Sequence, residues 1–487
     1  MAAEDDSSSA RPVVLFYTDN GIGLGHLTRQ LAIALRSRGA FQPLFLTMSA
    51  GFTLPRSAGI PTEYFPSYGR LDITKPEWEP MIMERLLEVI EATDTRAVVV
   101  DHVSPPRIFA ALRERAPRTR FIWSRRGLWQ PDKNRAAVSL SDEFDLVVEP
   151  GDVASVIDQG ATTAQRSGTV STAPVVMVDP ADYVPADEAR DALGIPREGR
   201  AVLVNVGDRS SDEVRRMIDR ATQAIRRHGG RDTHVFAPMH PLHGGEVGEV
   251  PGIHMAPVYP VARFFNAFDA VVSSSGYNSF HEVVASGLPA VFVPHRGARI
   301  DDQYRRAEFA SLCGRSQWAA NIFSREFDQA VRRMLRPYEP EIARRTTELL
   351  GSMNGAEEFA EVLAGLVAER PGPYPTGART STPTDHTPAL DRVVVALDLD
   401  GDELGQLVAT WSPDDIARTV VVTRDADPGP IYGLGVVFET ILDEDEWRRV
   451  GDYGYGEYVA MRLAGIERRY GTTQTIMNPL ETKVKTQ

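Results

Sequence analysis

The sequence predicts an α/β protein with two tandem Rossmann-like domains and a smaller α/β unit at the C-terminal end. The 487 residues are too many for one hydrophobic core. Short apolar runs rich in β-branched residues alternate with helical patterns, as in parallel sheets covered by helices. A turn of small residues follows the first strand of two separate series, which is where such folds bind anionic ligands.

The first domain is expected over residues 12–183, after an acidic, Ser-rich segment, 1–11, that we expect to be disordered. Each expected strand is a short apolar run, and the segments between them carry apolar residues at helical spacing. The expected strands are residues 13–17, 43–47, 97–100, 121–123 and 145–148, with helices starting near 27, 81 and 109.

The second domain is expected over residues 184–370, and a charged helix at 187–193 indicates the connection between the domains. Its pattern repeats that of the first domain, with strands feeding turns and helices. The expected strands are residues 201–205, 233–237, 270–272 and 290–293, with helices at 214–227, 261–268, 327–335 and 341–367.

The C-terminal unit is expected over residues 391–487, after a Pro-rich linker at 371–390. The sequence assigns no role to this unit. Its expected strands are residues 392–397, 419–423 and 436–440, with helices at 403–411 and 458–470 and a loose tail.

Composition narrows the class of protein. Lys and Arg number 53 and Asp and Glu 67, so the net charge is 53 − 67 = −14, which argues against nonspecific nucleic-acid binding. The single cysteine, Cys313, allows no intrachain disulfide and favours a reducing compartment. The N-terminus lacks signal-peptide character, and no apolar run approaches the ~20 residues that span a bilayer. We therefore expect a cytoplasmic protein; peripheral contact with the inner face of the membrane stays open.

The first Gly-rich turn runs from Gly21 through Gly23 and Gly25 to His26, and Arg29 follows on the next helix. Glycines let a backbone approach an anion, and the free N–H groups of the helix N-terminus point at it. The alternative is an ordinary tight turn of any Rossmann-like domain. The histidine and the arginine after the third glycine favour a functional loop.

Asp101 ends an expected strand at the same sheet edge as this turn. A carboxylate placed there can reach His26 and hold its tautomer. Capping of the following turn is an equally good explanation for an aspartate at this position.

A stretch from Ala270 to Gln303 predicts strand, turn, helix, strand and loop. Small residues at 273–276 form the turn, and Gly287 stands where a helix ends in a left-handed residue. A helix N-terminus at the carboxyl edge of a parallel sheet is again an anion site.

Together these features resemble glycosyltransferases of the GT-B fold, closest to the family 28 branch that contains the bacterial peptidoglycan GlcNAc transferase. The run from Gly21 to Arg29 resembles the N-terminal G-x-G-x-G-H-x-x-R signature, and the run from Ser275 to Glu282 the donor signature S-G-x-N/T-x-x-x-E. Pro294 followed by Asp301–Gln303 resembles the loop that closes the donor site. The resemblance covers about residues 12–370. It implies two domains with a cleft between them.

The resemblance places a nucleotide-sugar donor on the second domain. UDP is the nucleotide that the resemblance to the family favours. Glu282 would bind the ribose hydroxyls, and Asp302 with Gln303 the sugar hydroxyls, with Asp301 as the alternative register. Helix N-terminal N–H groups would meet the diphosphate charge. The expected donor-binding residues are Gly207, Ser210, His240, Ser275, Gly276, Tyr277, Asn278, Ser279, Glu282, Asp302 and Gln303.

Catalysis would need a base that takes the proton of the acceptor hydroxyl, and His26 is the matched residue. Asp19, in the same loop, competes for this role. Attack opposite the leaving group would invert the anomeric centre. Family relatives manage without a metal or other cofactor. The residues of the phosphate and acceptor loop would be Gly21, Gly23, Gly25, Arg29 and Arg126.

The transferred sugar would be GlcNAc or another hexose, and the acceptor a hydroxyl of a glycan, a lipid or a small molecule. Aromatic residues at 64–68 and Trp78 lie where such enzymes have acceptor loops, which favours an amphipathic acceptor. The turn after Asn205 departs from the family pattern, because Asp208 is unfavourable beside a diphosphate.

Other functions compete with this interpretation. A nucleotide-sugar hydrolase could use the same histidine loop to activate water, and sugar-nucleotide epimerases share two Rossmann-like domains. In the C-terminal unit, Asp398 and Asp400 follow a strand at the spacing of haloacid-dehalogenase phosphatases and could hold Mg²⁺. A polar turn in an accessory unit explains the same two residues more simply.

Overall fold

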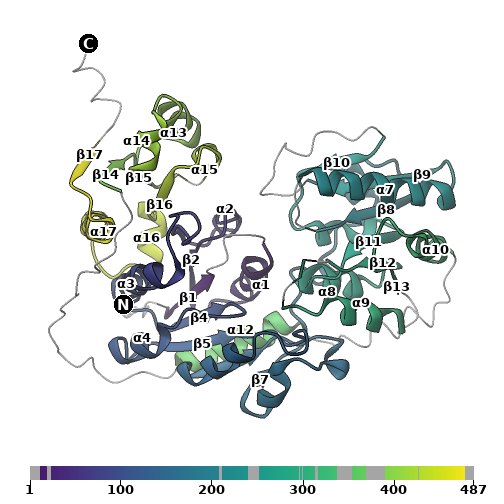
Figure 1. Cartoon of the computed structure of the whole chain (residues 1–487), viewed down its shortest axis with the longest axis horizontal. Coiled ribbons are helices and arrows are strands. Elements are labelled where there is room, and N and C mark those ends of the chain that lie inside the picture. The colour runs from purple at the N-terminus through teal and green to yellow at the C-terminus, as the bar shows by residue number, and fades with distance from the viewer. Residues whose placement is uncertain are drawn as a thin grey trace, which may run out of the picture.

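The computed structural model contains three parallel β-sheets, each covered by helices (Figure 1). This confirms the predicted α/β class. The structure describes residues 11–18, 24–207, 211–239, 252–295, 297–298, 300–312, 316–336, 354–368, 390–425 and 427–477. Segment 1–10 and the linker at 371–389, on which we made predictions, lie outside these ranges.

The first sheet has seven strands in the order β3-β2-β1-β4-β5-β6-β7. All of its neighbours pair in parallel, and the central strands are buried throughout, as expected when helices cover both faces. The strands are β1 (Val13–Thr18), β2 (Gln42–Thr47), β3 (Thr62–Tyr64), β4 (Ala97–Asp101), β5 (Arg120–Ser124), β6 (Leu146–Glu149) and β7 (Val170–Ser171). Its helices are α1 (Gly25–Ala34), α2 (Thr53–Ser57), α3 (Lys75–Ala92), α4 (Phe109–Arg115) and α5 (Arg135–Val138).

The second sheet has six strands in the order β10-β9-β8-β11-β12-β13. The expected helix at 261–268 is instead a 3₁₀ helix, Val261–Ala267. The strands are β8 (Arg200–Asn205), β9 (Thr233–Pro238), β10 (His254–Ala256), β11 (Ala270–Ser274), β12 (Ala290–Val293) and β13 (Ser316–Trp318). The helices are α6 (Ala186–Ala192), α7 (Ser211–Gly229), α8 (Tyr277–Ser286), α9 (Gln303–Leu312) and α10 (Arg325–Met334).

Helix α12 (Gly355–Ala368) belongs to the first sheet, although we assigned residues 184–370 to the second domain. Its apolar stripe, which includes Phe359 and Leu363, packs against Leu27 and Leu31 of α1 in one buried cluster, and Figure 1 shows α12 beside β5. A helix is placed by whichever surface buries its apolar face, and here that surface comes from the other end of the chain. The rest of the expected helix at 341–353 lies outside the described residues.

The third sheet has four parallel strands in the order β16-β15-β14-β17. Part of the expected loose tail is strand β17, which pairs with β14. The strands are β14 (Arg392–Val395), β15 (Thr419–Thr423), β16 (Val437–Thr440) and β17 (Gln474–Met477). The helices are α13 (Gly401–Val408), α14 (Pro413–Ala417), α15 (Gly429–Gly433), α16 (Glu444–Val450) and α17 (Tyr455–Tyr470).

The C-terminal unit is fused to the first domain rather than tethered beside it (Figure 1). Tyr64 stacks on Phe438 with ring centroids 4.6 Å apart, and helix α17 packs on α3. Tyr64 and Trp78 are each only 1% exposed. This contradicts our placement of acceptor contacts at Tyr64 and Trp78, because both side chains are buried, whereas Tyr68 of the same stretch is 43% exposed.

A buried charge cluster reinforces this joint. Arg462 and Arg469 of α17 both pair with Glu439 of β16, at 2.9 and 3.2 Å, and Arg469 also reaches Glu88 of α3 at 2.6 Å. Glu63 of β3 pairs with Arg462 at 3.2 Å. Removing one partner from such a cluster leaves an uncompensated buried charge, so the two parts are expected to fold together.

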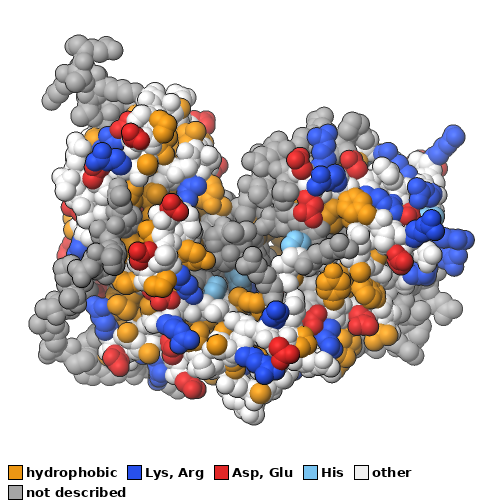
Figure 2. Space-filling view, viewed as in Figure 1, with side chains coloured by type: hydrophobic (Ala, Val, Ile, Leu, Met, Phe, Trp, Pro, Cys, Tyr) orange, Lys and Arg blue, Asp and Glu red, His pale blue; other side chains and the backbone are white. Residues whose placement is uncertain are grey.

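On the face drawn in Figure 2, charges of both signs are interspersed, and the surface is hollowed between the C-terminal unit and the second domain. Within the described ranges, no helix has both the length and the apolar composition needed to cross a membrane.

Candidate active site

A cavity of about 420 Å³ lies between the first and second sheets and has the size of a ligand pocket. Both sheets turn helix N-termini toward it, α1 from the first and α8 from the second. Expected site residues that line it are Gly25, His26, Arg29, Arg126, Gly207, Gly276, Tyr277, Asn278, Ser279, Glu282 and Gln303. Ser275, Asp302 and Asp101 do not line it.

His26 and Asp101 are in direct contact. His26 is in the first turn of α1, and Asp101 ends the neighbouring strand β4, so the sheet order brings them together. The His26 Nδ1 to Asp101 Oδ1 distance is 2.6 Å, and Ser124 Oγ donates to Asp101 Oδ2 at 3.2 Å. Asp101 therefore holds the imidazole, the first of the two explanations that the sequence left open.

The electrostatics fix the protonation of this pair. Burial alone would raise the pKa of Asp101, but Arg29 and His26 hold it well below its usual value. A carboxylate only accepts hydrogen bonds, so His26 Nδ1 carries the proton and Nε2 is the basic nitrogen. Burial lowers the pKa of His26 despite Asp101, which keeps the imidazole neutral at pH 7.

Arg29, expected in the phosphate and acceptor loop, lines the cavity, but its guanidinium is hydrogen-bonded to neighbouring side chains. It is 2% exposed, and its Nε donates to Asp101 Oδ2 at 2.7 Å. Its Nη1 points to Asn278 Oδ1 of the second domain, 3.4 Å away. A guanidinium engaged in this way orients neighbouring side chains rather than a diphosphate.

The N-terminus of α8 is a candidate anion site on the second domain. Its backbone N–H groups follow Gly276 at the N-cap, which no side chain caps. Gly207, after β8, faces it with φ +83°, and a Cβ there would lie 3.1 Å from Ser274 Oγ. Only glycine adopts this conformation without strain.

In two residues of the donor signature, the side-chain hydroxyl is hydrogen-bonded within the protein. The Ser275 hydroxyl donates to the Gln303 carbonyl at 2.9 Å. The Tyr277 hydroxyl donates to Gly151 O at 2.7 Å and accepts from Val175 N at 3.0 Å, both in the first domain. Their side-chain polar groups are thus already bound.

Glu282 is 8% exposed and lines the cavity from α8. Burial raises its pKa to about 7, although the backbone N–H of Met177 opposes the shift. A carboxyl group held near half-ionisation in a cavity is a candidate functional group.

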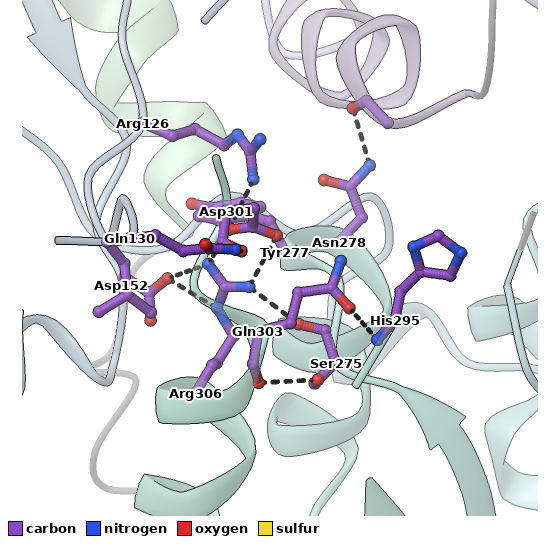
Figure 3. Close-up of polar contacts among 12 residues, drawn as sticks. Arg126, Gln130, Asp152, Ser275, Tyr277, Asn278, His295, Asp301, Gln303 and Arg306 are labelled. Carbon is purple, nitrogen blue, oxygen red and sulfur yellow. Dashed lines mark hydrogen bonds and ion pairs between the residues drawn. The ribbon is translucent and has the colours of Figure 1, made fainter. Parts of the chain in front are cut away.

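Of the acidic pair after β12, Asp301, the alternative register, lines the cavity, and Asp302 does not. Asp302 caps α9 by accepting from Arg305 N at 3.2 Å and does not line the cavity, whereas Asp301 and Gln303 both do (Figure 3).

Asp301 sits in a charged junction between the domains (Figure 3). Arg306 of α9 pairs with Asp301 at 2.8 Å and with Asp152 of the first domain at 2.9 Å. Arg126 reaches Asp301 at 3.4 Å from the loop after β5, while its Nε, buried, has no hydrogen-bond partner. Arg126 is thus the cation of this junction with hydrogen-bonding capacity to spare.

Sequence reasoning missed Asp152, Arg306 and the backbone junction beside them. Gln130 N donates to Ile300 O at 2.6 Å, and Asp302 N to Leu128 O at 2.9 Å. Asp152 follows β6 at the same sheet edge as Asp101, so the argument used for Asp101 would have found it. The contact between two distant loops has no sequence signal in a single chain.

Several expected residues cannot be placed. Those outside the described ranges are Asp19, Gly21, Gly23, Asp208, Ser210 and His240. In the C-terminal unit, Asp398 pairs with Arg424 at 2.7 Å, and Asp400 caps α13 by accepting from Glu403 N at 2.8 Å. Across the described part of the chain, no three His, Cys, Asp or Glu side chains gather as a metal site would require. The polar-turn explanation fits this geometry.

Sequence comparison finds curated relatives over part of the chain. Three of these relatives share the name UDP-N-acetylglucosamine–N-acetylmuramyl-(pentapeptide) pyrophosphoryl-undecaprenol N-acetylglucosamine transferase. The protein of Desulforudis audaxviator is 32% identical over 140 residues, 26% of this chain and 37% of the relative. Those of Rhodococcus erythropolis and Corynebacterium glutamicum are 27% and 26% identical over 31% and 23% of this chain, and 38% and 31% of their own. The match thus spans about a third of each relative's length. No known protein-family model matches.

Structural comparison finds glycosyltransferases over most of the chain. The spinosyn forosaminyltransferase SpnP superposes with a TM-score of 0.52 at 14% identity, over 74% of this chain and 100% of its own. The glycosyltransferase of kitacinnamycin gives 0.51 at 14% identity, over 74% and 99%. The chain therefore has the two-domain GT-B fold and resembles the family 28 glycosyltransferases.

Proposed function

We propose that this protein is an inverting glycosyltransferase that moves a sugar from a nucleotide diphosphate sugar to a hydroxyl group of its acceptor. One observation carries the proposal: the paired base His26 and the α8 donor features, Glu282 included, line one cavity between two Rossmann-like domains. The relatives named as GlcNAc transferases support a UDP-linked donor carrying GlcNAc or another hexose.

In the proposed donor pose, the diphosphate lies at the N-terminus of α8. Backbone N–H groups at the start of α8 and the guanidinium of Arg126, which lines the cavity, would meet its charge, so the pose relies on no metal. Glu282 would accept hydrogen bonds from the two ribose hydroxyls, because a carboxylate has two oxygens that can face a cis-diol. Asp301 and Gln303 would contact the sugar hydroxyls.

In the proposed reaction, the acceptor oxygen attacks the anomeric carbon on the face opposite the nucleotide. Its proton passes to His26 Nε2, the C–O bond to the acceptor forms, and the bond to the diphosphate breaks with its electron pair leaving on the nucleotide. Asp101 stabilises the imidazolium that results. Direct displacement of this kind inverts the anomeric centre.

The test is a proton NMR time course with α-linked UDP-sugars and a panel of hydroxyl acceptors. A β-linked product that forms only when an acceptor is present supports the proposal. Free sugar released at the same rate with and without acceptor would instead establish the hydrolase. The acceptor, whether glycan, lipid or small molecule, is identified by which panel member gives product.

A further inference from the structure

A continuous chain of hydrogen bonds connects the base to the opposite domain. His26 Nδ1 lies 2.6 Å from Asp101 Oδ1, and Arg29 Nε lies 2.7 Å from Asp101 Oδ2. The Nη1 group of Arg29 points to Asn278 Oδ1 at 3.4 Å, and Asn278 Nδ2 donates to Gly25 O at 2.9 Å. Asn278 belongs to α8, and Figure 3 shows its side chain directed at the ribbon of the first domain.

Water competes little with this series of hydrogen bonds. Arg29 and Asp101 are 2% and 1% exposed, so water competes little for their hydrogen bonds. His26 and Arg29 are three residues apart on α1 and share one face of the helix. Both carboxylate oxygens of Asp101 are occupied: Oδ1 accepts from His26 and from Arg29 Nη2, and Oδ2 accepts from Arg29 Nε and from Ser124 Oγ.

Helix α8, which carries the proposed donor site, therefore also contacts the residues that hold the base His26 in place. Asn278 is one helical turn before Glu282, and both line the cavity. Its two hydrogen bonds meet the backbone that starts α1 and the guanidinium that holds Asp101. A shift of α8 away from α1 would remove both.

We propose that Arg29 is a positioning residue that couples the base to the donor domain: it holds Asp101, and through it His26, while Asn278 of α8 holds Arg29 in turn. The catalytic consequence of this inference rests on the proposed function: His26 would have all of its hydrogen-bond support only when the two domains are closed on each other. The role of Arg29 in the hydrogen bond between His26 and Asp101 can be measured without any substrate.

The experiment follows the Nδ1–H proton of His26 by NMR in the full-length protein, as its rate of exchange with water. The charged and titratable groups that face His26 are Asp101, Arg29, Arg126 and His102. Asn278→Ala changes none of these charges and buries nothing new. We expect it to speed the exchange about threefold or more, and Arg29→Lys to speed it further, because a lysine cannot span both contacts.

The matched control is Tyr259→Phe, which removes a different hydrogen bond between the domains, from Tyr259 Oη to Thr28 Oγ1 at 2.7 Å. This bond does not lead to Asp101, so the control should exchange at the wild-type rate. Equal rates in Asn278→Ala and Tyr259→Phe would overturn the proposal.

Kinetics then separate positioning from ligand binding. Arg29→Lys should lower kcat about tenfold or more while the Kd for UDP stays within about twofold. An equal loss of UDP affinity and turnover would mean that Arg29 binds the diphosphate, and would also overturn the proposal. If the wild type transfers no sugar, the proposed function fails, whereas the proton exchange still decides the role of Arg29.

Discussion

Asp101 accepts the Nδ1–H of His26 at 2.6 Å, and this contact leaves Nε2 as the only basic nitrogen of the ring. His26→Gln should therefore lower turnover by about 10²-fold or more, since glutamine cannot take a proton. Nucleotide binding should persist, because His26 lies in the first domain and the proposed nucleotide site in the second. Steady-state kinetics and UDP calorimetry on the same samples check both halves; a parallel loss of UDP affinity would contradict the division of roles.

If Glu282 binds the ribose as proposed, nucleotide binding should depend on pH. Burial raises its pKa to about 7, and the ribose hydroxyls require the ionised form as acceptor. Below pH 7 the carboxyl must first lose its proton, so UDP should bind about tenfold more weakly at pH 6 than at pH 8. Calorimetry at the two pH values measures this.

The control for that prediction is Glu282→Gln, because the terminal phosphate of UDP also titrates near pH 6. The glutamine variant should bind UDP more weakly at both pH values. Its remaining pH dependence should come only from the titration of the UDP phosphate. A wild-type pH profile identical in shape to that of Glu282→Gln would exclude Glu282 as a group that must ionise.

The junction between the domains depends on Arg306, which is fully buried between Asp152 and Asp301. Arg306→Met leaves the buried carboxylate of Asp152 and the partly buried carboxylate of Asp301 without their shared cation and should cost about 3 kcal/mol or more of unfolding free energy. Arg305→Met is the matched control, since that neighbour is partly exposed, and it should cost less than about 1 kcal/mol. Urea unfolding curves measure the unfolding free energy of both variants. Equal losses of unfolding free energy would contradict the stabilising role given to Arg306.

The C-terminal unit should prove inseparable from the first domain. Arg469 is buried between Glu88 and Glu439, whereas its neighbour Arg468 is half exposed. We expect Arg469→Met to lower the unfolding free energy by about 3 kcal/mol or more and Arg468→Met by less than about 1 kcal/mol. A protein truncated after residue 370 that unfolds as cooperatively as the full chain would show that the unit is dispensable.

Local patterns predicted the parts of this molecule that local forces determine. The alternation of apolar runs and helical segments predicted the three-part α/β architecture, and the position of Asp101 at a strand end made its contact with His26 one of two open explanations. The placement of α12 could not follow from its own sequence, because an apolar stripe does not say which sheet it covers.

The errors at the site have the same origin. Tyr64 and Trp78 are aromatic enough for an acceptor loop, and only the folded structure shows that they are buried, Tyr64 against the C-terminal unit. Asp301 and Asp302 are adjacent identical residues, so the turn geometry alone decides which one faces the cavity. The pairing of Arg306 with Asp152 joins residues 154 positions apart.

The central claim is that the cavity between the domains binds a nucleotide through Glu282. Calorimetric titration of UDP into the wild type, Glu282→Ala and Glu361→Ala tests it most directly, since Glu361 is an exposed glutamate on α12. We predict that the wild type and Glu361→Ala bind UDP with equal affinity, while Glu282→Ala binds at least about tenfold more weakly. Unchanged UDP binding in Glu282→Ala would contradict the account.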